Sequence, residues 1–214
     1  MTRMIFVRHG ESMGNLNKLF YGHTNGGLTE KGKAQAAKTS EYLRDIHIDA
    51  AFASDLIRAY ETGRIVAEPH GLTVTPNVGL REIFAGEWEN MSFSDIPTKY
   101  PDTHRVWMSD IGNSRPDGGE SVRELSERVR GAVWNIAEEN DGKTVLIATH
   151  ATPIRVLACE WYGKSVEAAQ SIDWVKNASV SIVDYDVKKH TTAVVLYDEA
   201  SFMGDIATTL PKTV

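Results

Sequence analysis

The sequence predicts an α/β fold with a mostly parallel central sheet and an antiparallel edge strand. Short apolar segments alternate with segments of helical periodicity, which is the pattern of β–α–β units. Residues 144–149 form an uninterrupted apolar run, typical of a strand buried on both faces of a parallel sheet. The last two apolar segments flank a polar turn at residues 186–190, which indicates a hairpin and therefore an antiparallel pair.

The elements follow from these segments in chain order. Strands are expected at residues 5–7, 50–53, 72–75, 144–149, 180–185 and 192–197. Helices are expected where apolar residues recur at helical spacing between capping signals. The first is expected at residues 30–43 after the N-cap Thr29, and the second at residues 57–68 before Pro69 and Gly71. The third starts at the capping-box pair Ser121 and Glu124 and ends at residues 140–142. The fourth covers residues 153–161 and begins at Pro153.

Residues 83–120 interrupt this alternation. They mix glycine, proline and asparagine with aromatic residues, so we expect a long excursion that contains one or two short helices. The aromatic residues are Phe84, Trp88, Phe93, Tyr100 and Trp107.

The composition describes an acidic globular chain with a single cysteine. The 214 residues have a formal net charge of −6, which disfavours a nucleic-acid partner because such a surface repels phosphate backbones. Cys159 alone excludes a disulfide framework and a thiolate zinc site. The apolar run at residues 4–7 is too short for a signal peptide or a membrane span, so we expect a cytoplasmic protein that does not bind membranes.

Basic residues follow three of the expected strands at the point where each strand ends. Arg8 and His9 follow the first strand, Arg58 comes shortly after the second, and His150 follows residues 144–149. Because ligands bind at the carboxyl ends of parallel strands, we expect these side chains to meet at one rim of the sheet. Two arginines and two histidines would trap phosphate or carboxylate, since guanidinium groups bind such oxygens bidentately and keep their charge.

Two histidines at one anion site can divide the chemical work. One imidazole, held neutral by a hydrogen bond on its other nitrogen, can attack phosphorus, and a second, cationic imidazole can stabilise the equatorial oxygens. A carboxyl group must then protonate the departing oxygen and later activate water. Spacing alone does not choose that carboxyl group from the 29 acidic residues.

Six motifs are spread over nearly the whole chain. The first is Arg8-His9-Gly10-Glu11 within residues 6–12, with Asn15 downstream. The others are residues 28–36, 54–62, 80–83 with 86–89, 118–121, and 149–150 with 154–155. Together and in this order they resemble the histidine phosphatase superfamily, which contains the cofactor-dependent phosphoglycerate mutases and many small phosphatases. The combination is specific because every motif is present and in order.

This resemblance implies a three-layer α/β/α fold of the phosphoglycerate mutase-like type, with both faces of the sheet covered. It implies His9 as the phosphohistidine nucleophile and Glu82 as the proton donor. The implied chemistry needs no metal ion and no cofactor.

The resemblance also implies a set of phosphate ligands and reveals two departures from the family pattern. The implied ligands are Arg8, Asn15, Arg58 and His150. Ala151, which we include among the phosphate-binding residues, stands where the family usually has glycine, so the resemblance alone does not determine the loop geometry there. Asn25 stands where the family has aspartate.

Other charged residues near these motifs are expected to have ordinary roles. Arg81 is expected to form an ion pair, and Glu87 and Glu89 are expected at the surface beside Trp88. Five further histidines lack a motif and are expected in solvent: His23, His47, His70, His104 and His190.

We treat residues 1–214 as one domain with a cap or lid insertion at about residues 84–120. The aromatic residues of this insertion are either plain core or, with Lys99 and Arg105, a cover over the leaving group, and the sequence leaves both interpretations open.

Together these observations predict an enzyme of the histidine acid phosphatase type that hydrolyses a small phosphorylated metabolite without a metal ion. A second interpretation is a cofactor-dependent phosphoglycerate mutase, although residues 80–83 and 86–89 look more like the phosphatase branch. The third interpretation is an inactive phosphate-binding regulatory module, and the fourth is a metal-dependent hydrolase. The substrate, self-association into a homo-oligomer and the role of the tail at residues 201–214 are left open.

Overall fold

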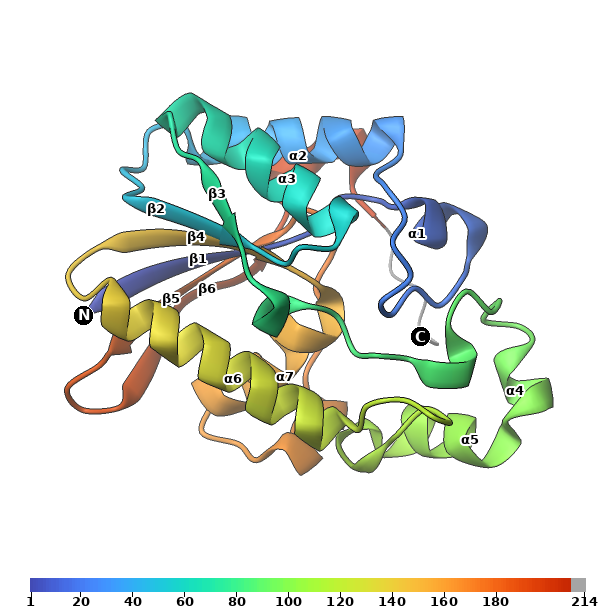
Figure 1. Ribbon diagram of the computed structural model, residues 1–214. Helices are drawn as coiled ribbons and strands as arrows, with labels where there is room; N and C mark the ends of the chain where they lie inside the picture. The colour runs from blue at the N-terminus through green and yellow to red at the C-terminus, as the bar shows by residue number, and fades with distance from the viewer. Residues whose placement is uncertain (209–214) are drawn as a thin grey trace.

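The computed structural model describes residues 1–208 and contains one six-stranded sheet between two layers of helices (Figure 1). The strands lie in the order β3-β2-β4-β1-β5-β6. They are β1 (Thr2–Arg8), β2 (Ala50–Ala53), β3 (Val74–Pro76), β4 (Thr144–Thr149), β5 (Val180–Asp186) and β6 (Thr191–Glu199). The first four are mutually parallel, and β5 is antiparallel to both β1 and β6. The predicted mostly parallel sheet is confirmed, and the reversed strand lies one position inside the edge strand β6.

The helices form the two outer layers that the sequence predicted. In Figure 1, α2 (Glu30–Leu43) and α3 (Ile57–Ala67) cover one face, whereas α6 (Val122–Glu139) and α7 (Ala151–Trp161) cover the other. The shorter helices are α1 (Met13–Asn17), α4 (Ile96–Lys99) and α5 (Pro101–Ser109). Six 3-10 turns complete the described chain: Glu68–His70, Val78–Leu80, Gly86–Trp88, Ile111–Asn113, Val166–Ser171 and Ser201–Ile206.

Strand β1 shows why the sheet needs helices on both faces. Successive side chains of a strand point to opposite faces. Met4 and Phe6 therefore pack in the core beneath α6 and α7, whereas Ile5 and Val7 pack in the core beneath α2 and α3. All four side chains are fully buried, so the apolar run that predicted this strand has no solvent face.

The helix ends agree with the predicted capping signals, with small shifts. Ser121 and Glu124 form the predicted capping box of α6, and Thr29 accepts the backbone N–H of Gly32 at the start of α2. Helix α7 begins at Ala151, two residues before the predicted start at Pro153. Proline is tolerated at this position because backbone N–H groups in the first turn of a helix have no partner within the helix. Strand β3 begins at Val74, two residues after the predicted start at residue 72, and ends at Pro76.

The excursion at residues 83–120 contains α4, α5 and two 3-10 turns and lies beyond the end of the sheet at which β1 terminates (Figure 1). Its two tryptophans, Trp88 and Trp107, are buried and pack edge-to-face on Phe20, with ring centroids 5.7 and 5.4 Å away. Much of the predicted insertion is therefore core. Of the helices in residues 1–208, none combines the length and apolar composition that crossing a bilayer requires.

Candidate active site

The carboxyl ends of three neighbouring strands bring the predicted basic residues together. The register pairs Arg8 of β1 with Thr149 of β4, so that His9 and His150 are the next residues on adjacent strands. Their rings lie edge to face with centroids 5.2 Å apart. Arg58 lies in the first turn of α3, which follows β2 at the same end of the sheet. The predicted juxtaposition of four basic side chains at one rim is confirmed.

A cleft of about 950 Å³ opens at this rim, large enough for a phosphate and a sizeable leaving group. Six of the seven predicted site residues line it: Arg8, His9, Asn15, Arg58, Glu82 and Ala151. The seventh, His150, is completely buried directly behind the His9 ring. The chain therefore assembles its candidate residues from segments that are far apart in sequence.

His9 is held as a neutral ring of defined tautomer. Its Nδ1 lies 2.7 Å from the carbonyl oxygen of Gly10, to which it donates, and this leaves Nε2 as the nitrogen with a free lone pair. Burial, followed by the positive charges of Arg58 and Arg8, holds the pKa of His9 well below its usual value. The side-chain amide of Asn177 donates to the His9 carbonyl at 3.0 Å and so helps to hold the backbone of His9.

His150 has a similar environment but a different hydrogen bond. Its Nε2 lies 2.8 Å from the Ser54 hydroxyl, and its Nδ1 is buried without a partner among the described residues. Burial and the charge of Arg58 lower the pKa of His150 well below its usual value, so the protein alone favours a neutral ring. The predicted cationic ring would require the opposite charge of a phosphate dianion beside it, which would raise this pKa.

The two arginines are buried and remain charged. Burial lowers the pKa of Arg8 to about 10 and that of Arg58 to about 10, and the charge of Glu82 opposes both shifts. Arg8 donates from Nη1 to the Val175 carbonyl at 2.5 Å, while its Nε is buried without a partner among the described residues. An unpaired buried donor is costly, and phosphate oxygens are acceptors suited to it.

Arg58 is oriented by backbone carbonyls. It donates from Nη1 to Thr24 at 3.0 Å, and from Nη2 to Tyr21 at 3.1 Å and Gly22 at 2.9 Å. These three carbonyls belong to the loop that runs from α1 toward α2. The position of this loop therefore sets the position of the guanidinium group in the cleft.

Glu89, predicted as a surface charge, instead holds that loop in place. Its half-buried carboxylate accepts the backbone N–H groups of His23 at 2.6 Å, Thr24 at 2.8 Å and Ala85 at 3.0 Å, and the Thr24 hydroxyl at 2.5 Å. The prediction for Glu89 was wrong because two of its backbone donors, His23 and Thr24, lie more than 60 residues away, which local sequence does not reveal. Its neighbour Glu87 is exposed, as predicted.

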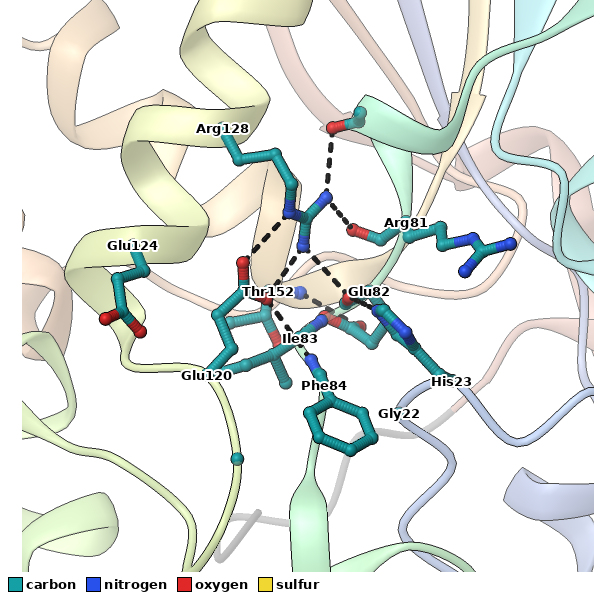
Figure 2. Close-up of polar contacts among 12 residues, drawn as sticks. Gly22, His23, Arg81, Glu82, Ile83, Phe84, Glu120, Glu124, Arg128 and Thr152 are labelled. Carbon is teal, nitrogen blue, oxygen red and sulfur yellow. Dashed lines mark hydrogen bonds and ion pairs between the residues drawn. The ribbon is translucent and has the colours of Figure 1, made fainter.

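The environment of His23 also differs from the prediction. It was predicted to be solvated, but it is half-buried and its Nε2 donates to the Glu82 carbonyl at 3.0 Å (Figure 2). By contrast, Arg81 forms the predicted ion pair, donating from Nε to Asp55 at 2.7 Å. His47, with its side chain 85% exposed, agrees with the prediction.

Glu82 is a buried carboxyl group in a setting that favours its protonated form. Its Oε1 accepts the Ile83 N–H at 2.8 Å, and its Oε2 accepts the Thr152 N–H at 3.3 Å. Burial raises the pKa of Glu82, and the hydrogen bonds and the charge of Arg58 only partly oppose this. A carboxyl group with a raised pKa suits proton donation near neutral pH.

Asparagine residues complete the cleft next to His9. The Asn15 side-chain oxygen accepts from the Ser12 N–H at 3.1 Å and from Asn177 at 3.2 Å. With its oxygen engaged, Asn15 presents amide N–H groups to the cleft that it lines. The side-chain oxygen of Asn25 accepts the Ile57 N–H at 2.8 Å and so caps α3. An aspartate oxygen could make the same hydrogen bond.

Three polar residues of the site were not singled out from the sequence. Ser54 is the first residue of the motif at residues 54–62, directly after β2, and Thr152 lies between residues 149–150 and 154–155 at the start of α7; these positions were the available signal. Asn177 precedes β5 and reaches His9 only because β5 pairs with β1. No sequence motif marks it.

The excursion contributes aromatic surface but no charge to the cleft. Phe93 and Trp107 line it, so these aromatic residues serve both the core and the cleft. Lys99 and Arg105, predicted as members of a cover, are exposed and do not line it; Arg105 instead pairs with Asp102 at 3.1 Å. Within residues 1–208, no cluster of three or more histidine, cysteine, aspartate or glutamate side chains is arranged to hold a metal ion.

Comparison with known proteins gives consistent matches over nearly the whole chain. The family model described as histidine phosphatase superfamily (branch 1) matches residues 4–198. The chain is 30% identical over 190 residues to phosphoserine phosphatase 1 of Hydrogenobacter thermophilus, covering 89% of this chain and 90% of that protein. It is 30% identical over 185 residues to the probable phosphoglycerate mutase GpmB of Salmonella typhi, covering 86% of each. The solved structure of Bacillus stearothermophilus YhfR superposes with a TM-score of 0.90 at 27% identity, covering 95% of this chain and 100% of that one.

Proposed function

The chain belongs to the histidine phosphatase superfamily, and from this we propose that it hydrolyses phosphomonoesters of small metabolites through a phosphohistidine formed on His9. The observation that carries the proposal is the state of His9. Its Nδ1 is engaged by the Gly10 carbonyl and its ring is kept neutral among Arg8, Arg58 and His150. A neutral imidazole nitrogen surrounded by donors is poised to attack a bound phosphate.

In the first step, the Nε2 lone pair of His9 attacks phosphorus and the bond to the ester oxygen breaks. Glu82, protonated because burial raises its pKa, donates its proton to the departing oxygen, so the leaving group departs as a neutral alcohol. Arg8 and Arg58 stabilise the charge on the equatorial oxygens. The phosphoryl group is then bound to Nε2.

In the second step, the Glu82 carboxylate accepts a proton from a water molecule as that water attacks the phosphoryl group. The nitrogen–phosphorus bond breaks, inorganic phosphate is released, and the His9 lone pair is restored. Because Glu82 is protonated again at the end, one carboxyl group serves both half-reactions. The Gly10 carbonyl holds the His9 tautomer throughout.

The phosphate pocket that we propose is completed by donors around His9. Asn15 offers its amide, and the Ala151 backbone lies at the start of α7, where a helix N-terminus favours anions. His150 would donate from its otherwise unpartnered Nδ1 to a phosphate oxygen. These donors carry the phosphoryl charge without a metal ion.

The remainder of the cleft offers a mixed surface to the leaving group. Phe93, Trp107 and Trp174 supply aromatic area, and Lys18 supplies a positive charge. We propose that residues 84–120 act as a cap through Phe93 and Trp107, which contact the leaving group.

Direct assays of two reactions test the proposed activity. We expect release of inorganic phosphate from p-nitrophenyl phosphate that is unchanged by a metal chelator, and negligible conversion of 3-phosphoglycerate in the presence of 2,3-bisphosphoglycerate. Mutase turnover with little hydrolysis would favour the mutase activity suggested by the GpmB relative. Loss of hydrolysis on chelation would indicate a metal-dependent enzyme, and no turnover of any phosphomonoester would indicate a binding module.

Substitution Arg58→Ala should weaken binding of substrate and of inorganic phosphate alike. Loss of a charge-assisted hydrogen bond of about 1.5–3 kcal/mol corresponds to a rise of about ten- to a hundredfold in the phosphate inhibition constant. The measurement is competitive inhibition by phosphate. Arg64→Ala, an exposed arginine later on α3, is the matched control and should leave the constant unchanged. Unaltered phosphate inhibition in Arg58→Ala would remove Arg58 from the pocket.

A further inference from the structure

The segment that carries Glu82 has no regular secondary structure to hold it. Residues 81–85 lie between the 3-10 turns Val78–Leu80 and Gly86–Trp88 and pair with no strand. A proton donor must nevertheless be held within about 0.5 Å of its productive position. The hydrogen bonds of this segment therefore show what positions the carboxyl group.

Arg128 of α6 donates to three backbone carbonyl groups in and just before this segment (Figure 2). From Nη1 it donates to the carbonyl oxygens of Gly79 at 3.1 Å and Arg81 at 3.1 Å, and from Nη2 to that of Glu82 at 3.2 Å. The intervening carbonyl, that of Leu80, accepts the Thr149 hydroxyl at 2.7 Å. Four consecutive carbonyl groups up to and including Glu82 are thus fixed from outside the segment.

Glu120 fixes both Arg128 and the far side of the same segment. Its Oε1 accepts Nε of Arg128 at 2.9 Å and its Oε2 accepts Nη2 at 2.8 Å. The same Oε2 accepts the Phe84 N–H at 3.2 Å, and the Glu120 N–H donates to the Phe84 carbonyl at 2.8 Å. Arg128 and Glu120, hereafter the clamp, therefore hold the chain on both sides of Glu82.

The clamp depends on the specific shape of arginine. Arg128 makes five hydrogen bonds from three nitrogen atoms, which matches the five N–H donors of a guanidinium group. Lysine has three donors on a single atom and could not reach the same acceptors. The pair is half-buried, with side chains 27% and 15% exposed, so these bonds are only partly exchanged with water.

We propose that Arg128 and Glu120 are positioning residues for the proton donor, holding Glu82 where its carboxyl group can reach the leaving oxygen. This inference rests on the proposed role of Glu82 in the reaction. Neither side chain lines the cleft, so neither contacts the substrate. Their effect on catalysis passes through the backbone of residues 79–84.

Leaving-group dependence separates positioning of an acid from general support of the fold. A p-nitrophenolate group departs without being protonated, whereas an alkoxide must receive a proton. A displaced Glu82 should therefore lower kcat/KM, which reports formation of the phosphoenzyme, for glycerol 2-phosphate and leave kcat/KM for p-nitrophenyl phosphate nearly unchanged. A damaged phosphate pocket should slow both.

The experiment compares Arg128→Lys, Glu120→Gln and Glu82→Gln on these two substrates, with Arg130→Lys, an exposed arginine on the same helix, as control. For Arg128→Lys we expect kcat/KM for glycerol 2-phosphate to fall about ten- to a hundredfold, since a displacement of about 1 Å can cost that much. We expect unchanged phosphate inhibition and almost no change in kcat/KM for p-nitrophenyl phosphate. Glu120→Gln keeps one acceptor oxygen and should show the same pattern more weakly, which provides the test if Arg128→Lys does not fold.

The double variant Glu82→Gln/Arg128→Lys decides whether the clamp acts through Glu82. If it does, the second substitution adds little to the loss caused by the first. Additive losses, or equal losses on both substrates, would overturn the clamp while leaving the role of Glu82 intact. If Glu82→Gln itself shows no leaving-group dependence, the proposed proton donor is wrong and the clamp inference falls with it.

Discussion

His9→Ala should abolish the phosphoenzyme and reduce turnover of p-nitrophenyl phosphate by on the order of 10⁴-fold or more, the scale seen when a covalent nucleophile is removed. Without the imidazole there is no lone pair at the centre of the cationic pocket. Arg8, Arg58 and Glu82 remain, so substrate binding should survive the substitution better than turnover. The expected signature is therefore a fall in kcat with a comparatively small change in phosphate inhibition.

Rapid quenching with labelled substrate gives the chemical identity of the intermediate. The wild-type protein should trap label that is released by acid and retained in alkali, as expected for a phosphohistidine, and His9→Ala should trap none. His47→Ala, which removes a histidine with an 85% exposed side chain, should trap as much label as the wild type. Label that proves stable in acid, or that maps to a carboxylate or to Cys159, would contradict the mechanism.

The positions of His9, Arg58 and His150 could be predicted from the sequence because each directly follows or closely follows an apolar strand. Parallel pairing then brings these three side chains together, since the carboxyl ends of β1, β2 and β4 share one edge of the sheet. The fold was predictable for the same reason. Short buried strands and capped helices carry local signals that tertiary contacts reinforce.

Residues whose role depends on backbone partners far along the chain could not be predicted in this way. Glu89 was assigned to the surface, yet its carboxylate collects N–H groups of the loop that positions Arg58. His23 was assigned to solvent, yet it donates to the Glu82 carbonyl. Neither residue has a local pattern that distinguishes it from a surface residue, because the contacts between residues 23–24 and residues 82–89 form only on folding.

Asn177 is a third residue whose role could not be predicted from the sequence. It reaches the His9 carbonyl because the antiparallel strand β5 runs beside β1, so the short segment that leads into β5 lies next to the residue after β1. The hairpin of β5 and β6 was predicted, as was an antiparallel strand at the sheet edge, but the pairing of β5 with β1 was not. Without the strand order, no argument from spacing connects residue 177 with residue 9.

Glu82→Gln should lower kcat/KM for alkyl phosphates by about 10²–10⁴-fold, the usual contribution of a general acid. The amide retains most of the shape of the carboxyl group and removes the transferable proton. Loss with p-nitrophenyl phosphate should be much smaller in the first step, because that leaving group departs as an anion. Glu87→Gln, the neighbouring exposed carboxylate, is the control and should behave as wild type.

The pH profile gives an independent test of the same residue. Burial raises the pKa of Glu82, so the donating form persists to higher pH than for an ordinary glutamate. For alkyl phosphates, kcat/KM should therefore fall as the pH rises through this elevated pKa, and the fall should be absent from the residual activity of Glu82→Gln. A descending limb that persists unchanged in the variant would assign it to another group.

The same pKa shift predicts that, at high pH, Glu82→Gln affects stability with the opposite sign to its effect on activity. The folded state binds the Glu82 proton more tightly than the unfolded state does, so this group contributes stability at low pH that is lost as the pH rises through its folded pKa. Above that pKa, the buried carboxylate destabilises the fold. Glu82→Gln should therefore raise the Tm at alkaline pH and have less effect at low pH, where the wild-type group is already neutral. A variant that is less active yet more stable at high pH would show that the protein retains an unfavourable buried acid because the reaction requires it, whereas a Tm lowered equally at every pH would indicate that Glu82 is a structural residue.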